Sequence, residues 1–128
     1  MNLHAKLLQR QAEGRPVRVG LIGAGKFGSM YLAQVPRTPG VHLAGIADLS
    51  PEGARRNLAR VGWEAERTQA ASLDAALRDG STHIGDDWRA LVSHPAVDII
   101  VECTGHPIAA VDHCLEAFAH GKHVVNVT

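Results

Sequence analysis

The sequence predicts an α/β fold in which helices cover both faces of a doubly wound parallel sheet with strand order 3-2-1-4-5. Apolar runs of strand length alternate with segments of helical periodicity along the chain. The runs are apolar at nearly every position, which is typical of strands buried on both faces. Crossovers between parallel strands are right-handed, and this rule leaves few possible strand orders.

An additional helix is predicted ahead of the sheet. Leucines recur at helical spacing within residues 3–13, and Gly14 followed by an Arg-Pro pair ends the pattern. We therefore divide the chain into an N-terminal helix over residues 1–15 and one domain over residues 16–128. A chain of 128 residues has the size of a single domain with one core.

The next four elements alternate between strand and helix. Continuous apolar residues predict strands over residues 17–22 and 41–48. The helix between them spans residues 26–35 and ends where Pro36 removes a backbone donor. The following helix begins at a Ser-Pro pair, because serine caps a helix and proline suits its first position, and it ends at Gly62.

The rest of the sheet comes from the second half of the chain, where residues 63–82 are the least regular part. Residues 97–105 form the clearest strand of the chain, because they are almost wholly apolar. The other segments predicted here are a short helix over 72–78, a strand at 83–84, a helix capped by Asp86 or Asp87 and ending at Val92, and a last strand over 123–127.

A helix between the last two strands has two distinct faces. On one face His113, Glu116 and His120 lie at i, i+3 and i+7, a spacing that could hold a metal ion. We interpret this face as solvated and expect no metal site, because it lies opposite an apolar stripe. That stripe is predicted to face the core and consists of Ile108, Val111, Leu115 and Phe118.

Composition narrows the classes of function. Hydrophobic residues make up 45% of the chain and charged residues 20%, as in ordinary globular domains. Thirteen basic residues balance thirteen acidic ones, so no net charge favours nucleic acid or an anionic membrane. Cys103 and Cys114 lie in apolar contexts, and no signal peptide or membrane span is evident. We expect a cytoplasmic protein without nucleic-acid or membrane partners.

A glycine motif, G-x-G-x-x-G, occupies residues 23–28, where the first strand is followed by a helix. Gly23 would permit a tight turn, Gly25 would let the backbone approach a pyrophosphate, and Gly28 would let the helix pack closely on the sheet. Free N–H groups and the dipole at a helix N-terminus favour an anion there. A glycine turn without a ligand is the alternative, but the surrounding strand, helix and downstream acid favour a dinucleotide and a Rossmann-type fold.

The downstream acid is Asp48, which ends the second strand about 20 residues beyond the last glycine, where a carboxylate binds the adenosine ribose hydroxyls. A carboxylate at this place would repel a 2′-phosphate, which favours NAD over NADP. Arg55 and Arg56 are the counter-argument, since they could reach such a phosphate. A solvated helix face explains these arginines better. The expected cofactor is NAD or NADP, with NAD preferred.

Other candidates near the predicted site have simpler explanations. Cys103 has no evident neighbouring base, and we interpret it as a small buried residue at a strand end. His106 precedes Pro107 and is better explained as the entry to a helix than as a catalytic base. Trp63 and Trp88 are interpreted as packing residues.

Four segments resemble a known family of enzymes: VRVGLIGAGKFGSMY, IADLSP, DWRALVSHPAVDIIVECTG and GKHVVNV. Together they resemble the N-terminal domain of homoserine-dehydrogenase-like NAD(P)-dependent oxidoreductases. The DWRAL segment is also similar to the glucose-fructose oxidoreductase and inositol dehydrogenase family. With its leading helix, the chain most resembles the homoserine-dehydrogenase-like group that carries a C-terminal SAF domain. Some members of that group are 1-deoxy-D-xylulose 5-phosphate reductoisomerases.

The resemblance implies which residues contact the cofactor. Asp48 would contact the adenosine ribose. The residues implied at the pyrophosphate are Gly23, Gly25, Lys26, Phe27 and Gly28. Those implied along the cofactor toward the nicotinamide-side ribose are Cys103, Thr104 and Gly105.

The final strand departs from the glucose-fructose oxidoreductase pattern. In that pattern the strand continues into Glu-Lys-Pro, whose lysine is catalytic, whereas this chain stops at Thr128. An apolar strand that ends without a covering element predicts a fragment of a longer enzyme. We therefore expect the catalytic residues beyond Thr128, together with the contacts of a homo-oligomer.

Two classes of function follow. The first is the cofactor-binding half of an NAD(P)-dependent oxidoreductase of homoserine-dehydrogenase-like type, with hydride transfer to or from a carbonyl or hydroxyl of a small-molecule substrate. The alternative is a non-catalytic regulatory module that senses dinucleotides. The resemblance favours the enzyme, and we expect residues 1–128 to bind cofactor without turnover.

Overall fold

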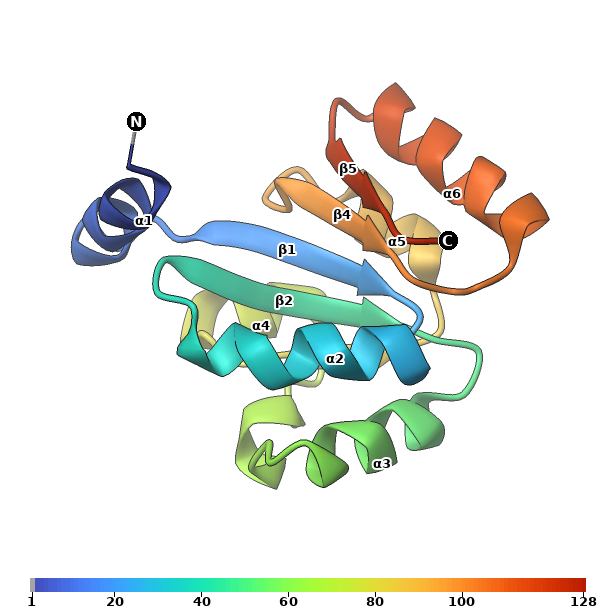
Figure 1. Ribbon diagram of the computed structural model, residues 1–128, viewed down its shortest axis with the longest axis horizontal. Coiled ribbons are helices and arrows are strands. Elements are labelled where there is room, and N and C mark those ends of the chain that lie inside the picture. The colour runs from blue at the N-terminus through green and yellow to red at the C-terminus, as the bar shows by residue number, and fades with distance from the viewer. Residues whose placement is uncertain (1) are drawn as a thin grey trace.

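The computed structural model describes residues 2–128 and contains a five-stranded parallel sheet of order β3-β2-β1-β4-β5 (Figure 1). The predicted doubly wound order is therefore confirmed. The strands are β1 (Val17–Ile22), β2 (Val41–Ala47), β3 (His83–Gly85), β4 (Ile99–Glu102) and β5 (His123–Asn126). β4 is shorter than the strand predicted over residues 97–105, because its partner β1 extends only from Val19 to Ile22 opposite it.

The helices begin and end close to the predicted positions. Ser50 caps the third helix, its Oγ accepting a hydrogen bond from the N–H of Gly53 at 3.1 Å. Asp87 rather than Asp86 caps the fifth, accepting from the N–H of Ala90 at 3.1 Å. The helices are α1 (Leu3–Ala12), α2 (Lys26–Gln34), α3 (Pro51–Arg60), α4 (Leu73–Asp79), α5 (Trp88–Ser93) and α6 (Pro107–Ala119), with 3-10 turns η1 (Val35–Arg37) and η2 (Ala65–Thr68).

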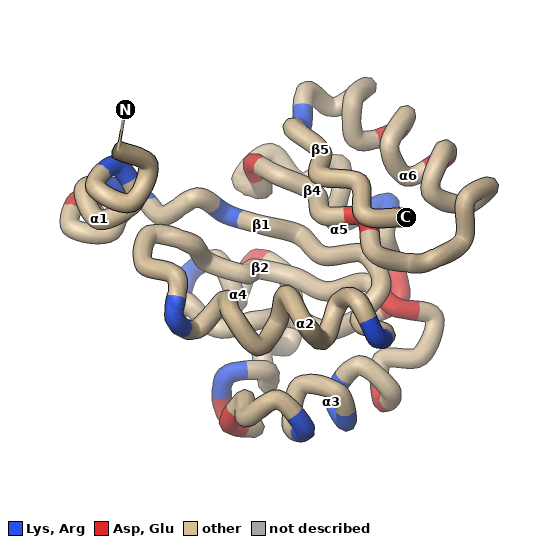
Figure 2. The backbone as a smooth tube through the Cα atoms, in the orientation of Figure 1, with Lys and Arg blue, Asp and Glu red and all other residues tan. Residues whose placement is uncertain are grey.

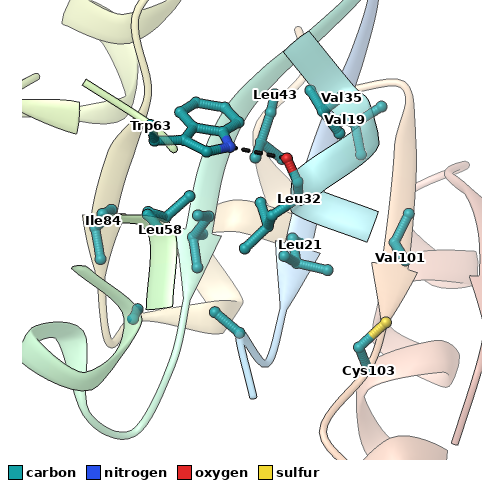
Figure 3. Packing of buried hydrophobic residues seen from close by; sticks show 13 residues of the cluster. Val19, Leu21, Leu32, Val35, Leu43, Leu58, Trp63, Ile84, Val101 and Cys103 are labelled. Atoms are coloured by element: carbon teal, nitrogen blue, oxygen red, sulfur yellow. Dashed lines mark hydrogen bonds between the residues drawn. The ribbon is translucent and has the colours of Figure 1, made fainter. Parts of the chain in front are cut away.

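One face of the sheet packs against α2 and α3 (Figures 1 and 3). Leu32 of α2 and Leu58 of α3 are fully buried against strand residues such as Leu21 and Leu43. Trp63 lies at the edge of this cluster, and its indole N–H donates to the carbonyl of Leu32 at 2.8 Å. The packing function expected of this tryptophan is therefore present in the structure.

The other face packs against α5 and α6, and here one prediction is wrong. The stripe predicted to face the core is exposed on α6, with Ile108 at 86% and Phe118 at 59% of full exposure. The buried face instead carries Ala110, His113 and Ala117. Small alanines let the helix approach the sheet closely, and the buried imidazole is paired with an acid on β4, so this face needs no large apolar side chain.

The strand register brings the carboxyl ends of four strands to one edge of the sheet. Ile22 at the end of β1 lies opposite Ala47 of β2 and Glu102 of β4, and Ala47 lies opposite Gly85 of β3. The loops that follow these strands therefore meet at one place. α1 lies at the other end of β1, far from this edge (Figure 1).

Candidate functional site

A pocket of about 330 Å³ lies at the carboxyl ends of β1 to β4. Ligands of open α/β sheets bind at this edge, and the volume falls in the range of small-molecule sites. Its walls are mostly apolar. The lining residues are Ile22, Gly23, Gly25, Ala47, Asp48, Leu49, Asp86, Trp88, Cys103, Thr104, His106, Ala109 and His113.

The three glycines of the turn after β1 have different functions in the fold. Gly23 has a φ of +90°, and a Cβ placed on it would lie 2.8 Å from the backbone of Cys103. A Cβ on Gly28 would lie 2.5 Å from the carbonyl oxygen of Gly23. Gly25 differs, since a Cβ there would meet no protein atom within 4 Å. Folding therefore requires Gly23 and Gly28, whereas Gly25 keeps space open beside the pocket.

Two of the helices that begin at the pocket, α2 and α6, carry no side-chain cap. Gly25 precedes α2 and His106 precedes α6, and neither provides a side-chain hydrogen bond to its helix. By contrast, α1, α3, α4 and α5 are capped by Asn2, Ser50, Ser72 and Asp87. The first-turn N–H groups of α2 thus remain available as donors beside the glycine turn, an arrangement that suits an anion.

Asp48 connects the end of β2 to the glycine turn. One carboxylate oxygen accepts from the N–H of Ala24 and the other from the N–H of Ser50, both at 2.8 Å. Each oxygen keeps a further lone pair for a ligand. Arg55 is paired with Glu52 at 2.7 Å and does not contact Asp48. Arg56 forms no ion pair with Asp48 either among the residues described, although its guanidinium extends toward Gly53 in the first turn of α3. The carboxylate therefore lies in the pocket wall without an ion-pair partner.

Glu102 is the principal polar residue beneath the pocket, and sequence reasoning assigned it no function. Its side chain is fully buried at the end of β4. One carboxylate oxygen accepts from the N–H and hydroxyl of Thr104, at 2.8 and 2.6 Å, and from the hydroxyl of Thr128 at 2.8 Å. The other is hydrogen-bonded to Nδ1 of His113 on α6. Burial raises the pKa of Glu102, but these hydrogen bonds outweigh it and hold the pKa below its ordinary value.

His113 is 7% exposed, and its imidazole forms part of the pocket wall. Its ring lies edge-on to Trp88, with 4.4 Å between the ring centroids. Trp88 also lines the pocket, and it packs against the core. The surface-facing histidine expected from the sequence is thus buried beside the candidate site, and Glu116 and His120 point away from it on the same helix.

The remaining predicted residues divide into two groups. Cys103 and Thr104 line the pocket, together with Gly23, Gly25 and Asp48. Burial, followed by the nearby Glu102 carboxylate, raises the pKa of the Cys103 thiol, so this side chain is not an activated nucleophile. The residues that lie outside the pocket lining are Lys26, Phe27, Gly28 and Gly105.

Lysines and arginines are interspersed with acidic residues over the molecule (Figure 2). Within residues 2–128, no cluster of three or more histidine, cysteine or acidic residues could hold a metal ion. None of the helices described here is long and apolar enough to cross a membrane.

The chain is similar to homoserine dehydrogenases and to a biliverdin reductase. A homoserine dehydrogenase of Methylobacillus glycogenes is 31% identical over 87% of this chain, which spans 24% of that relative. Among solved structures, a homoserine dehydrogenase from Thiobacillus denitrificans superposes with a TM-score of 0.62 at 24% identity, over 87% of this chain and 23% of that one. A biliverdin reductase from Synechocystis sp. PCC 6803, solved with biliverdin and NADP+, superposes with a TM-score of 0.63 at 20% identity, over 87% and 29%.

These structural likenesses show a shared fold, and the chain spans about a quarter of the relatives' length. The SAF domain and the reductoisomerase activity of the resembling group find no counterpart among them. Residues 19–128 match the family described as the homoserine dehydrogenase NAD-binding domain. The expected NAD(P) cofactor class agrees with this family. This chain therefore belongs to the homoserine dehydrogenase NAD-binding domain family.

Proposed function

We propose that this chain is the cofactor-binding half of an NAD(P)-dependent oxidoreductase and that its pocket holds the adenosine half of the dinucleotide. The observation that carries the proposal is the uncapped N-terminus of α2 beside Gly25, within reach of Asp48 across the same pocket. This arrangement offers donors to a pyrophosphate and acceptors to a ribose diol in one pocket. The regulatory alternative has no specific observation in its favour.

In this proposal each wall of the pocket binds one part of the cofactor. The pyrophosphate lies over Gly23 and Gly25 and accepts hydrogen bonds from N–H groups of the first turn of α2, contributed by Lys26, Phe27 and Gly28. The ribose hydroxyls donate to Asp48. The adenine lies in the apolar part of the pocket, which is bounded by Leu49, Trp88, Ala109 and His113. The dinucleotide then continues past Cys103, Thr104 and Gly105 toward its nicotinamide end.

A bound nicotinamide supplies the hydride-transfer chemistry of this enzyme class. The residues described here bind and orient the cofactor: Asp48 and the glycine turn hold it, and Glu102 fixes the Thr104 loop that borders it. We propose that the acid–base residues, the small-molecule substrate site and any contacts between subunits belong to parts of the whole protein beyond this domain.

We also propose that NAD binds more tightly than NADP. A 2′-phosphate about 4 Å from the Asp48 carboxylate would meet a repulsion of about 4 kcal/mol per charge pair at an effective dielectric of about 20. No arginine pairs with Asp48 within residues 2–128, and Arg55 is already paired with Glu52. Both features disfavour the phosphorylated cofactor.

The experiment is a calorimetric titration of this chain with NADH and NADPH. We expect NADH to bind at least tenfold more tightly, as roughly 1.4 kcal/mol of the repulsion would produce. Asp48→Asn removes the charge and keeps the shape, so it should narrow the ratio, whereas Asp112→Asn on the exposed face of α6 should leave it unchanged. Tighter binding of NADPH by the unmodified chain would refute the preference, and absence of binding to either nucleotide would refute the proposed function.

A further inference from the structure

His113 contributes an imidazole to the mostly apolar wall of the pocket. Its Nδ1 is hydrogen-bonded to Glu102, and its ring is held edge-on against Trp88 with 4.4 Å between centroids. Glu102 has no exposed surface, and its other carboxylate oxygen is occupied by the two threonines that flank it. The imidazole is therefore held in one orientation from two sides.

Glu102 also determines which ring nitrogen carries the proton. An ionised carboxylate can only accept hydrogen bonds, so Nδ1 of His113 must be the donor to it. Nε2 is then the nitrogen whose state changes: it accepts a hydrogen bond while the ring is neutral and donates one when the ring is protonated.

Nε2 is available to a ligand. No protein group in residues 2–128 forms a hydrogen bond with it, although His113 is more than nine-tenths buried. The two nitrogens of an imidazole point to different sides of the ring, so Nε2 is directed away from Glu102, and the pocket lies against this residue. Leu49, which follows Asp48, and Ala109 line the same pocket as His113, so a base attached to a ribose at Asp48 would lie near this histidine.

We propose that His113, oriented by Glu102, reads the base of the bound dinucleotide, its neutral Nε2 accepting a hydrogen bond from the 6-amino group of adenine. This inference rests on the proposed function, which places the adenosine half of the cofactor in this pocket. A 6-oxo purine presents an acceptor to an acceptor at the same point and is rejected.

The surroundings of His113 contain several other titratable or charged groups. They are Glu102 from β4, Cys103 after it, Asp48 after β2, Asp86 after β3, Arg89 over the Trp88 ring, and His106 at the rim of the pocket. His106 is the other histidine that lines this pocket, so a control must separate its contribution from that of His113.

The test compares NADH with reduced nicotinamide hypoxanthine dinucleotide, which carries a 6-oxo group in place of the 6-amino group. Dissociation constants of both are measured by calorimetry on this chain. We expect NADH to bind roughly tenfold more tightly, as one lost hydrogen bond produces.

Variants then assign the effect to His113. His113→Gln can both donate and accept, so its ratio should fall to about one. His120→Gln is the matched control on the same helix, because His120 is exposed and its Nδ1 contacts the carbonyl of Glu116 at 2.9 Å. This variant and His106→Asn should keep the tenfold ratio. Glu102→Gln removes the charge that holds Nδ1 protonated and should reduce the discrimination.

Three outcomes would overturn the inference. They are a ratio of about one in the unmodified chain, a tenfold ratio that persists in His113→Gln, and loss of the tenfold ratio in His106→Asn alone. In each of these both dinucleotides bind, so the proposed function stands while the function of His113 is refuted. Failure of both dinucleotides to bind would refute the proposed function, and this inference with it.

Discussion

Replacing Gly25 should separate binding from folding. A Cβ at this position would meet no protein atom within 4 Å, but the backbone angles of Gly25, φ −83° and ψ −144°, lie outside the regions that L-residues favour. Gly25 is also the N-cap of α2, a position where glycine is better than alanine or valine. We therefore expect Gly25→Ala and Gly25→Val to lower the free energy of unfolding by about 1 to 3 kcal/mol, without a steric clash.

Binding should respond very differently, because the added carbon occupies the space through which the pyrophosphate approaches the backbone. If two N–H donors of the first turn of α2 lose a charged acceptor, at about 1.5 to 3 kcal/mol each, the loss is at least about 3 kcal/mol. That corresponds to a dissociation constant for NADH more than about 100-fold higher. Valine should have a larger effect than alanine, since its branched side chain fills more of the space.

The assay combines urea unfolding, followed by the fluorescence of buried Trp63, with calorimetric titration of NADH. Gly28→Ala is the contrasting variant, because its Cβ would lie 2.5 Å from the Gly23 carbonyl oxygen and should lower stability itself. NADH binding by Gly25→Val equal to that of the unmodified chain would refute the reasoning. A loss of stability in Gly25→Val as large as in Gly28→Ala would refute it as well.

Three further predictions concern stability. Glu102→Ala should lower the free energy of unfolding by about 3 to 5 kcal/mol, because it leaves a buried imidazole without its partner; a loss below about 1 kcal/mol in urea unfolding would contradict this. The pKa of Glu102 is lower in the folded state, so ionised Glu102 stabilises the fold fully above the ordinary carboxyl pKa. This stabilisation is lost as the pH falls through the pKa of the folded state. The free energy of unfolding of Glu102→Gln should therefore lack this loss during acid unfolding. Trp63→Phe should cost about 1 to 3 kcal/mol, since the Leu32 carbonyl loses its donor, and thermal unfolding without a shift in Tm would count against it.

The fold and much of the candidate site could be predicted from local patterns. The glycine motif, the strand before it and Asp48 after β2 are each defined by a few consecutive residues, and parallel strands necessarily bring their carboxyl ends to one edge. Predicted positions such as Gly23, Asp48 and Thr104 accordingly line one pocket in the structure.

The burial of α6 could not be predicted in this way. Two stripes of α6 have helical spacing, and hydropathy alone favours the larger apolar side chains of Ile108 and Phe118 as the core face. The structure buries Ala110, His113 and Ala117 instead. A buried histidine is stable only with a hydrogen-bond partner, and that partner, Glu102, lies on a neighbouring strand rather than on the same helix.

The sequence by itself therefore determined the order of the elements, the glycine turn and the acid that follows β2, because each depends on residues close together in the chain. Only the tertiary structure decided that Glu102, Thr104, His113 and Thr128 form one hydrogen-bonded group beneath the pocket. It also decided that Gly25, unlike Gly23 and Gly28, faces open space. The physical reason is that hydrogen bonding and steric clearance depend on atoms brought together from distant segments. Local periodicity in the sequence does not predict the distances between those atoms.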